Sequence, residues 1–163
     1  MFCFAVKIVF NGKITIGDSN MLNSNLKFCR EELGMTQTEL GYVFGISDAA
    51  VRQWENGYNI MPLSKLINFC NLYDYSLDFV VGLSRKNTQY GKFKTNKKII
   101  GDNLKEIRKN LNLSQQDFCD KCNISQTTYS GYETGKYLIT STNLYVICKT
   151  YKISMDTICG RKK

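Results

Sequence analysis

A segment of this chain occurs twice. Residues 26–83 align with residues 104–161 at a constant offset of 78 residues, without insertion or deletion, and 15 of the 58 aligned positions are identical. Unrelated segments do not share this many residues without a gap, so we infer a duplication that fills most of the 163 residues with two small units. The identical pairs include Leu26/Leu104, Arg30/Arg108, Leu33/Leu111, Gln37/Gln115, Ile46/Ile124, Ser47/Ser125, Glu55/Glu133, Gly57/Gly135 and Cys70/Cys148.

Each unit carries the same series of helix start and stop signals. A hydroxyl residue followed three positions later by an acidic residue, as at Thr36 and Ser114, is typical of a helix N-terminus, because the two side chains satisfy amides of the first turn. Glycine after a helical run, as at Gly57, ends a helix because it readily adopts positive φ. With apolar residues at helical spacing, these signals predict helices at 24–33, 36–44, 47–55, 62–73 and 76–82, and again 78 residues later.

The amino-terminal segment carries a β-hairpin signal. Apolar residues alternate with other residues up to Phe10, the turn dipeptide Asn11-Gly12 follows, and the alternation resumes at Ile14. Asn-Gly supplies the positive φ angles of a two-residue hairpin turn. A lone hairpin is seldom stable in water, so we expect this one to pack on a helical unit or to pair across a dimer.

The formal charge is spread unevenly along the chain. Of the net +8, residues 26–83 contribute −3, whereas residues 84–103 and 104–163 contribute +5 each. Electrostatic attraction to a polyanion is therefore expected in the second half. The repeat, the helix start and stop signals and the charge distribution together divide the chain into four parts. These are an N-terminal hairpin extension (1–20), a first domain (21–83), a basic linker (84–100) and a second domain (101–163).

The composition disfavours several classes of protein. There is no histidine, the usual general base of hydrolases and a common metal ligand, so we expect no enzyme activity, no metal and no cofactor. Cys119 and Cys122 have the spacing of half a zinc site, but the same spacing suits one buried helix face. The seven cysteines, an odd number, and the lack of an export signal or a membrane-spanning apolar run indicate a soluble cytoplasmic protein with reduced thiols.

Three motifs of the first unit resemble the Cro and phage-repressor helix-turn-helix family, also called the XRE family: Met35-Thr36-Gln37-Thr38-Glu39-Leu40, Ile46-Ser47 and Trp54-Glu55-Asn56-Gly57. The second unit is similar to the same family at Leu113-Ser114-Gln115-Gln116-Asp117-Phe118, Ile124-Ser125 and Tyr132-Glu133-Thr134-Gly135. The resemblance implies a mainly α fold, with two lambda-repressor-like five-helix domains in tandem after a short N-terminal β-hairpin.

The resemblance also assigns roles outside the grooves of DNA. Gln37 and Gln115 match a position that binds a backbone phosphate, which fixes docking without specifying sequence. Lys136 is expected beside a phosphate as well. A further pair of positions ties the first helix to the third and is expected to be mainly structural; it corresponds here to Arg30 with Glu55 and Arg108 with Glu133.

By the same resemblance, the third helix of each unit enters the major groove. Arg52 can pair with guanine, Gln53 or Gln126 with adenine, and Thr127 with the methyl group of thymine. Asp48 would direct a carboxylate towards phosphates, which makes the first unit the poorer reader. The candidate groove residues are Ser47, Asp48, Ala49, Arg52 and Gln53 in the first unit and Ser125, Gln126, Thr127 and Ser130 in the second.

Sequence and resemblance together predict a sequence-specific, double-stranded-DNA-binding transcriptional regulator, a repressor that controls genes on a phage, plasmid or other mobile element. The two units would act as an internal pseudo-dimer on one duplex, since dimeric readers place two recognition helices about one helical turn apart. An alternative keeps only the second unit on DNA and makes the acidic first unit a protein–protein module. A homodimer would then form through the first unit or through the N-terminal hairpin.

Overall fold

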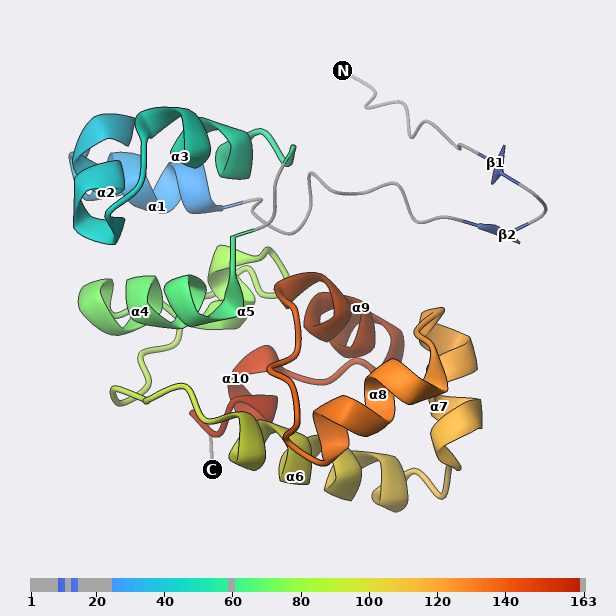
Figure 1. Cartoon of the computed structure of the whole chain (residues 1–163). Coiled ribbons are helices and arrows are strands. Elements are labelled where there is room, and N and C mark those ends of the chain that lie inside the picture. Colours follow the sequence, from blue (N-terminus) through green and yellow to red (C-terminus); the bar gives the residue numbers. More distant parts are fainter. Residues whose placement is uncertain (1–8, 11–12, 15–24, 59–60, 162–163) are drawn as a thin grey trace.

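The computed structural model describes residues 9–10, 13–14, 25–58 and 61–161, and this part of the chain is mainly helical (Figure 1). Two successive sets of five helices follow the repeat. The first set is α1 (Leu26–Glu32), α2 (Gln37–Phe44), α3 (Asp48–Glu55), α4 (Leu63–Tyr73) and α5 (Leu77–Val80). The second set is α6 (Lys97–Asn110), α7 (Gln115–Cys122), α8 (Gln126–Glu133), α9 (Ser141–Tyr151) and α10 (Met155–Ile158).

The predicted hairpin of residues 1–20 is not supported as an element of the fold. Two short strands, β1 (Val9–Phe10) and β2 (Lys13–Ile14), pair antiparallel, with Val9 opposite Ile14. The other residues of the predicted hairpin lie outside the described part of the chain.

Side-chain caps set the helix starts where the sequence predicts them. Thr36 accepts a hydrogen bond from the Glu39 amide, and Glu39 accepts one from the Thr36 amide, so the capping box is complete. At Ser114 only the serine half of this arrangement forms, because the shorter Asp117 side chain bonds the Ser114 hydroxyl instead of its amide. Pro62 occupies the N-cap of α4 and not the first turn. The capping residue precedes each helix, which is why most helices begin one residue later than predicted.

Helix α6 departs from the expected pattern at both ends. Leu111, although identical to Leu33 in the first unit, is 43% exposed at the C-cap of α6. Helix α6 begins at Lys97 and so includes the last residues of the expected linker. The extra turn lies against α8, where Gly101 permits contact: a Cβ there would lie 2.3 Å from the carbonyl oxygen of Tyr132.

The segment between α5 and α6 is held against the first set of helices. The Asn71 side chain donates to the carbonyl oxygen of Phe93 (2.6 Å) and accepts from its amide (3.1 Å). Asn87 accepts from the Ser76 amide at 2.8 Å and donates to the carbonyl oxygen of Asp74 at 3.1 Å. These four hydrogen bonds fix the path of the chain between the two sets.

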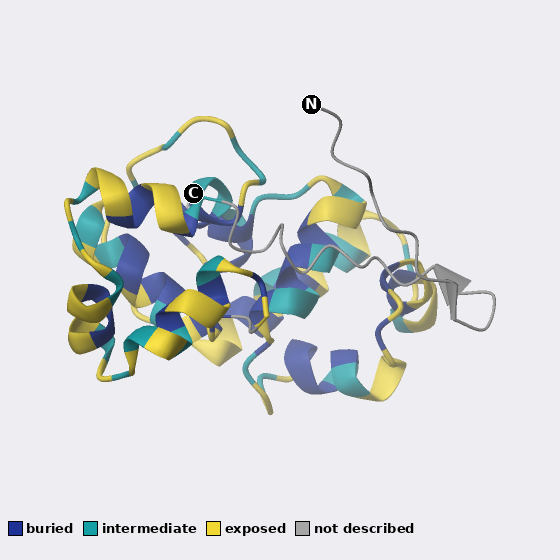
Figure 2. Cartoon of the chain, turned by 90° about the horizontal axis from the view of Figure 1, so that it is seen from above, coloured by how far each residue is buried: buried dark blue, intermediate teal, exposed yellow. Residues whose placement is uncertain are grey.

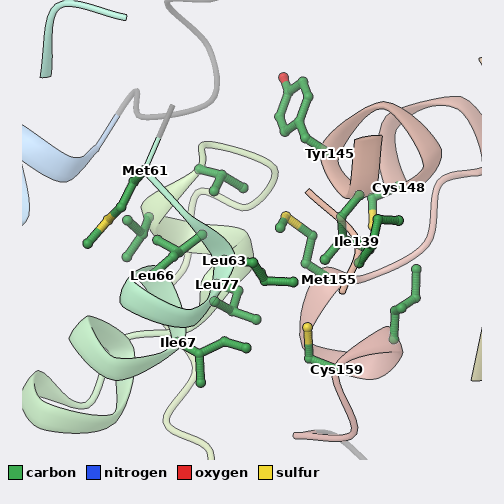
Figure 3. Packing of buried hydrophobic residues seen from close by; sticks show 14 of the residues in the cluster. Met61, Leu63, Leu66, Ile67, Leu77, Ile139, Tyr145, Cys148, Met155 and Cys159 are labelled. Atoms are coloured by element: carbon green, nitrogen blue, oxygen red, sulfur yellow. The ribbon is translucent and has the colours of Figure 1, made fainter. Parts of the chain in front are cut away.

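The two sets share one apolar core. Figure 3 shows Leu63 and Leu77 of the first set facing Ile139 and Met155 of the second, and all four side chains are buried. Figure 2 shows that buried residues follow the inner faces of the helices and exposed residues the outer faces. Burial of this kind is the main stabilising contribution to such an interface.

Helices α5 and α10 are joined by reciprocal hydrogen bonds from equivalent residues. The carboxylate of Asp156 accepts from the amides of Leu77 (3.1 Å) and Asp78 (3.0 Å). In return the carboxylate of Asp78 accepts from the amide of Met155 at 2.7 Å. Each aspartate therefore satisfies first-turn amides of the opposite helix, which have no acceptor within their own helix. The equivalence of the contacts is approximate, since Asp156 receives two bonds and Asp78 one.

Arg161 closes this interface on one side. Its guanidinium lies 3.5 Å from the Asp156 carboxylate and donates to the carbonyl oxygen of Tyr75 at 3.2 Å. The arginine is buried, and the equivalent position in the first unit is Leu83. A buried guanidinium needs its partners, because an unpaired buried charge is strongly unfavourable.

Candidate nucleic-acid interface

Helices α2 and α3, and their equivalents α7 and α8, form two compact helix–turn–helix pairs. The turn is short because Gly45 (φ 62°) and Asn123 (φ 52°) adopt left-handed conformations at the ends of α2 and α7. Gly41 permits the tight approach in the first pair, since a Cβ there would lie 2.7 Å from the carbonyl oxygen of Ile46. Ser47 and Ser125 then cap α3 and α8 through the amides of Ala50 and Thr128.

A buried ion pair anchors each third helix to the first helix of its set. Arg30 donates through Nε and Nη2 to both oxygens of Glu55, at 2.5 and 3.1 Å, and Arg108 does the same to Glu133 at 2.6 and 3.2 Å. The remaining nitrogen of each arginine donates to a backbone carbonyl, that of Met35 or Leu113. The Glu55 and Glu133 side chains are only 1% and 2% exposed, so these pairs are internal braces.

In the second unit the brace stays ionised because each charge faces its partner. Burial opposes ionisation of Glu133, but the hydrogen bonds from Arg108 and Gln115 outweigh it and hold its pKa below the usual value. The hydrogen bond to Glu133 raises the pKa of Arg108, and Glu55 raises that of Arg30 in the same way. The Arg108–Glu133 pair therefore persists across the physiological pH range.

Gln37 and Gln115, predicted to bind phosphate, connect these braces to the third helices. Gln37 donates to Glu55 at 2.7 Å and Gln115 donates to Glu133 at 2.6 Å, through the amide nitrogen in each case. Since a carboxylate only accepts hydrogen bonds, each glutamine must direct its carbonyl oxygen away from it. That oxygen contacts the third helix, at Arg52 in the first unit and at Gln126 in the second, and the amide group retains a second N–H.

The exposed surface of α3 is dominated by one ion pair. Arg52, whose side chain is 57% exposed, donates to the Asp48 carboxylate one turn earlier at 3.1 Å. Its Nε makes a longer contact of 3.5 Å with the side-chain amide oxygen (Oε1) of Gln37. Ala49 and Gln53 are exposed on the same helix.

The exposed surface of α8 is polar and uncharged. Gln126 donates through its side-chain amide nitrogen to the side-chain amide oxygen (Oε1) of Gln115 at 3.0 Å. Thr127 is exposed, whereas Ser130 is half-buried and its carbonyl oxygen accepts from the Thr134 hydroxyl at 2.8 Å. The Ser125 hydroxyl is bonded to that of Thr128 at 2.7 Å. Gln126 and Thr127 are thus exposed polar groups at the start of this helix.

Sequence reasoning missed the role of Tyr137, which lies over the middle of α8. A Cβ at Gly131 would lie 2.6 Å from the Tyr137 ring, so glycine leaves the space that the ring occupies. In α3 the residue equivalent to Gly131 is Gln53, so the first copy has a side chain at the position that the second copy leaves open for the Tyr137 ring. The ammonium group of Lys136 lies 5.1 Å from the centre of the same ring.

Lysines gather at the C-terminal end of α8. Lys97, at the start of α6, donates to the carbonyl oxygen of Lys136 at 3.2 Å. Lys98 follows it and pairs with Asp102 one turn later. The equivalents of Lys97 and Lys136 in the first unit are Ser19 and Tyr58, so this positive charge belongs to the second unit alone.

The cysteines of the described residues are buried thiols. Burial raises the pKa of Cys119 to about 11 and also raises the pKa of Cys122. Both thiols are therefore neutral at physiological pH, whereas a thiolate is the form that binds metal. Within the described part of the chain, no group of three or more acidic or cysteine side chains is arranged to hold a metal ion. Likewise, no described helix is both long and apolar enough to span a membrane.

Comparison with known proteins relates parts of this chain to named regulators. The chain is 40% identical over 62 residues to the cryptic phage CTXphi transcriptional repressor RstR of Vibrio cholerae, covering 38% of this chain and 55% of that protein. It is 30% identical over 87 residues to an uncharacterised HTH-type transcriptional regulator, YqaE of Bacillus subtilis, covering 53% of this chain and 66% of that protein. It is also 32% identical over 65 residues to the antitoxin PezA of Streptococcus pneumoniae, covering 40% and 41%.

The chain spans about half the length of these curated relatives. No solved structure matches it significantly. The helix-turn-helix family model matches twice, at residues 26–80 and at residues 104–158, and each match contains one of the braced helix pairs. The chain therefore belongs to the helix-turn-helix family, with two copies of the family's domain in tandem.

Proposed function

We propose that this protein is a sequence-specific, double-stranded-DNA-binding transcriptional repressor whose two domains act as an internal pseudo-dimer. The observation that carries the proposal is the double match to the helix-turn-helix family, together with relatives named as transcriptional repressor and regulator. Helix α8, and α3 with it, would enter successive major grooves of one duplex.

The contact between α5 and α10 supports the pseudo-dimer. Equivalent residues of the two copies bond each other there, as the two subunits do in an isologous dimer. A shared apolar core on both sides of that contact gives the pair a fixed geometry. A fixed pair avoids the loss of translational freedom that two separate subunits undergo when they assemble on DNA.

The chemistry of α8 favours an A·T pair under the second domain. Gln126 uses one amide N–H on Gln115, which leaves a carbonyl oxygen and a second N–H for the two major-groove atoms of adenine. Thr127 is exposed beside it and suits the methyl group of thymine. Lys97 and Lys136 supply positive charge for the neighbouring phosphates.

A gel-shift titration over a range of salt concentrations tests this function. We expect one chain to bind one duplex and to protect two half-sites, with the Gln126→Ala, Thr127→Ala double variant losing sequence preference in the half-site under α8. Both side chains are exposed, so the substitutions should leave the fold intact. Equal binding of all duplexes by the unaltered chain would refute a sequence-specific regulator, and protection of one half-site would refute the pseudo-dimer.

A second candidate function is self-association through the outer face of α2. Tyr42 is 89% exposed there and Val43 is also exposed, whereas the equivalent residues on α7 are Asp120 and Lys121. A Tyr42→Asp, Val43→Lys variant carries the residues of the second copy at both positions. If the first domain is a protein–protein module, sedimentation of the full chain will show dimers that this variant lacks.

A further inference from the structure

The two recognition helices differ in one paired feature of their reading surfaces. In α3, the first residue and the residue one turn later are Asp48 and Arg52, which form an ion pair at 3.1 Å. In α8, the equivalent residues are Gln126 and Ser130, and Gln126 bonds Gln115 instead. The first residue of each helix thus stands in a different hydrogen-bonding arrangement.

The contacts of Arg52 use one edge of its guanidinium group. Nη2 donates to the Asp48 carboxylate at 3.1 Å, and Nε lies 3.5 Å from the side-chain amide oxygen (Oε1) of Gln37. A guanidinium has five N–H groups in a planar fork, so contacts along the Nε–Nη2 edge leave the Nη1–Nη2 edge with one hydrogen on each nitrogen. That remaining edge offers two parallel donors.

Two parallel donors select guanine among the four bases. The major-groove edge of guanine presents two acceptors, N7 and O6, whereas adenine presents one acceptor and one donor. Gln126 suits a different base. It donates one side-chain N–H to Gln115, so its second N–H and its side-chain oxygen remain as a donor beside an acceptor, which fits adenine. The equivalent glutamines Gln37 and Gln115 therefore support two readers of different specificity.

We propose that Asp48 is a positioning residue that holds Arg52 for a guanine contact, so that the two domains read unlike half-sites. This inference rests on the proposed function and names its substrate: an operator with a G·C pair under α3 and an A·T pair under α8. The chain then docks on its operator in a single orientation. The sequence alone places Asp48 among the candidate groove residues but gives its carboxylate only an unfavourable effect near phosphates.

Repulsion and positioning by Asp48 have different consequences for the Asp48→Asn variant. If Asp48 only repels phosphates, removing its charge strengthens binding to every duplex by the same factor and leaves the preference for guanine unchanged. If Asp48 positions Arg52, the preference for guanine falls although the net charge has become more favourable. The ratio of affinities for two duplexes separates these effects, because general electrostatic attraction cancels in the ratio.

The experiment begins with selection of bound fragments from random duplex DNA by the full chain. Competition binding then compares the selected duplex with duplexes altered at single base pairs. The variants are Asp48→Asn, Arg52→Ala and a charge-matched control, Asp74→Asn. Asp74 is the exposed C-cap of α4 and has a left-handed backbone (φ 57°), which asparagine also tolerates.

We expect replacement of one guanine to weaken binding by the unaltered chain about tenfold or more, within the range for a bidentate arginine–guanine pair. Arg52→Ala should abolish this discrimination and Asp48→Asn should lower it several-fold, whereas Asp74→Asn should retain it. A variant with the α8 residues in α3 (Asp48→Gln, Ala49→Thr, Arg52→Ser) should select an operator with two like half-sites. All of these side chains lie on the surface or partly exposed, and circular dichroism checks that each variant is folded.

Three results would overturn the inference while leaving the proposed function in place. The unaltered chain could select an operator with two like half-sites, or Arg52→Ala could leave the discrimination at every guanine unchanged. The third result is an Asp48→Asn variant whose ratio of affinities for the duplexes with and without the guanine equals that of the unaltered chain. In each case Gln126→Ala would still alter sequence preference. If neither the unaltered chain nor any variant prefers one duplex over another, the proposed function fails and the inference fails with it.

Discussion

Asp78 and Asp156 lie 78 positions apart in the sequence and bind the first turns of each other's helices. Asp156 accepts two amide hydrogen bonds from α5, and Asp78 accepts one from α10. Capping is usually local to one helix, and the serines at positions 76 and 154 already provide it. The aspartates add a cap from the other copy, so the hydrogen bonds that complete each short helix also join the two domains.

Removing the Asp156 carboxylate should destabilise the whole chain. Asp156→Ala leaves two buried amides without an acceptor and Arg161 without its counter-ion, so we expect a loss of ~3–5 kcal/mol in the free energy of unfolding. Asp78→Ala should lose less, ~1–3 kcal/mol, because one amide is affected. Urea unfolding followed by circular dichroism measures both values.

The exposed Asp102, which pairs with Lys98 within α6, provides the control. Asp102→Ala should change stability by less than ~0.5 kcal/mol. The single tryptophan, Trp54, lies in the first domain, so its fluorescence should follow circular dichroism in the unaltered chain and separate from it in Asp156→Ala. Equal losses in Asp156→Ala and Asp102→Ala would show that the cross-domain bonds contribute nothing.

Asp156 should also give the stability a specific pH dependence. Burial raises the pKa of Asp156 from its usual 3.8 to about 6, although the amides of Asp78 and Leu77 and the charge of Arg161 favour the carboxylate. Between these two values the folded chain binds more protons than the unfolded chain, so this group's contribution to stability grows as pH falls from 6 towards 4. The total change is at most ~3 kcal/mol, since one pKa unit corresponds to ~1.4 kcal/mol.

Unfolding free energies of the unaltered chain and of Asp156→Asn, measured from pH 4 to 7, isolate this group. The difference between the two proteins should shift in favour of the unaltered chain as pH falls. Glu133 acts in the opposite direction, because its lowered pKa makes acid destabilising, but it is common to both proteins and cancels in the difference. A difference that is constant with pH would contradict the raised pKa.

The contact between α6 and α8 should not tolerate a methyl group at Gly101. A Cβ there would lie 2.3 Å from the Tyr132 carbonyl oxygen and 2.9 Å from that of Glu133, and both are backbone atoms that cannot rotate away. We expect Gly101→Ala to lower the free energy of unfolding by ~1–3 kcal/mol, as overpacking does, even though alanine favours a helix by ~1 kcal/mol.

Gly91→Ala is the matched control, since no atom lies within 4 Å of the added methyl group. Thermal unfolding should show a lower Tm for Gly101→Ala and an unchanged or slightly higher Tm for Gly91→Ala. A rise in Tm for Gly101→Ala would mean that helix propensity outweighs the contact.

The helices were predictable because their signals are local. Thr36 and Ser114 cap the helices that the sequence assigns to them, and Gly57 ends α3 with φ 73°. Each of these signals depends on residues within one turn of each other. The partners Arg30 and Glu55 were reached by family resemblance, because no local rule links positions 25 residues apart.

The contacts between the copies were not predictable from one domain's pattern. Asp78 and Asp156 are identical in the two copies, yet an acidic residue in a first helical turn already has a local explanation in the helix dipole. Tyr137 was missed for a related reason: its ring occupies the space beside Gly131, and a glycine in a helix does not indicate which residue packs on it. In both cases the partner is determined by tertiary packing, which produces no periodic pattern of residues that could be recognised in the sequence.

The hydrogen bond between Gln115 and Gln126 extends the role expected of Gln115. A phosphate contact alone would make any change at Gln115 weaken all duplexes alike. Because Gln115 also accepts from Gln126 at 3.0 Å and donates to Glu133 at 2.6 Å, we expect Gln115→Met to reduce preference for adenine as well as overall affinity. The loss of discrimination should be within the ~1–3 kcal/mol of a bidentate pair.

Competition binding with duplexes that differ at the adenine measures this effect. Gln116→Met serves as the control, since Gln116 is exposed on the same helix and bonds Asp120 within it. Uniform weakening of every duplex by Gln115→Met would assign this residue to phosphate alone.

Lys136 should contribute affinity without specificity. Its ammonium group lies over the Tyr137 ring at the end of α8, where Lys97 donates to its carbonyl oxygen. A lysine that neutralises one phosphate releases about one counter-ion, so Lys136→Gln should lower the slope of log affinity against log salt by ~1 and weaken all duplexes by a similar factor. Lys86→Gln, an equal change of charge in the segment that follows α5, should leave the slope nearly unchanged. If Lys136→Gln instead altered the preferred sequence while the slope stayed the same, Lys136 would be a base reader, and α8 would lie in the groove with its C-terminal end inward.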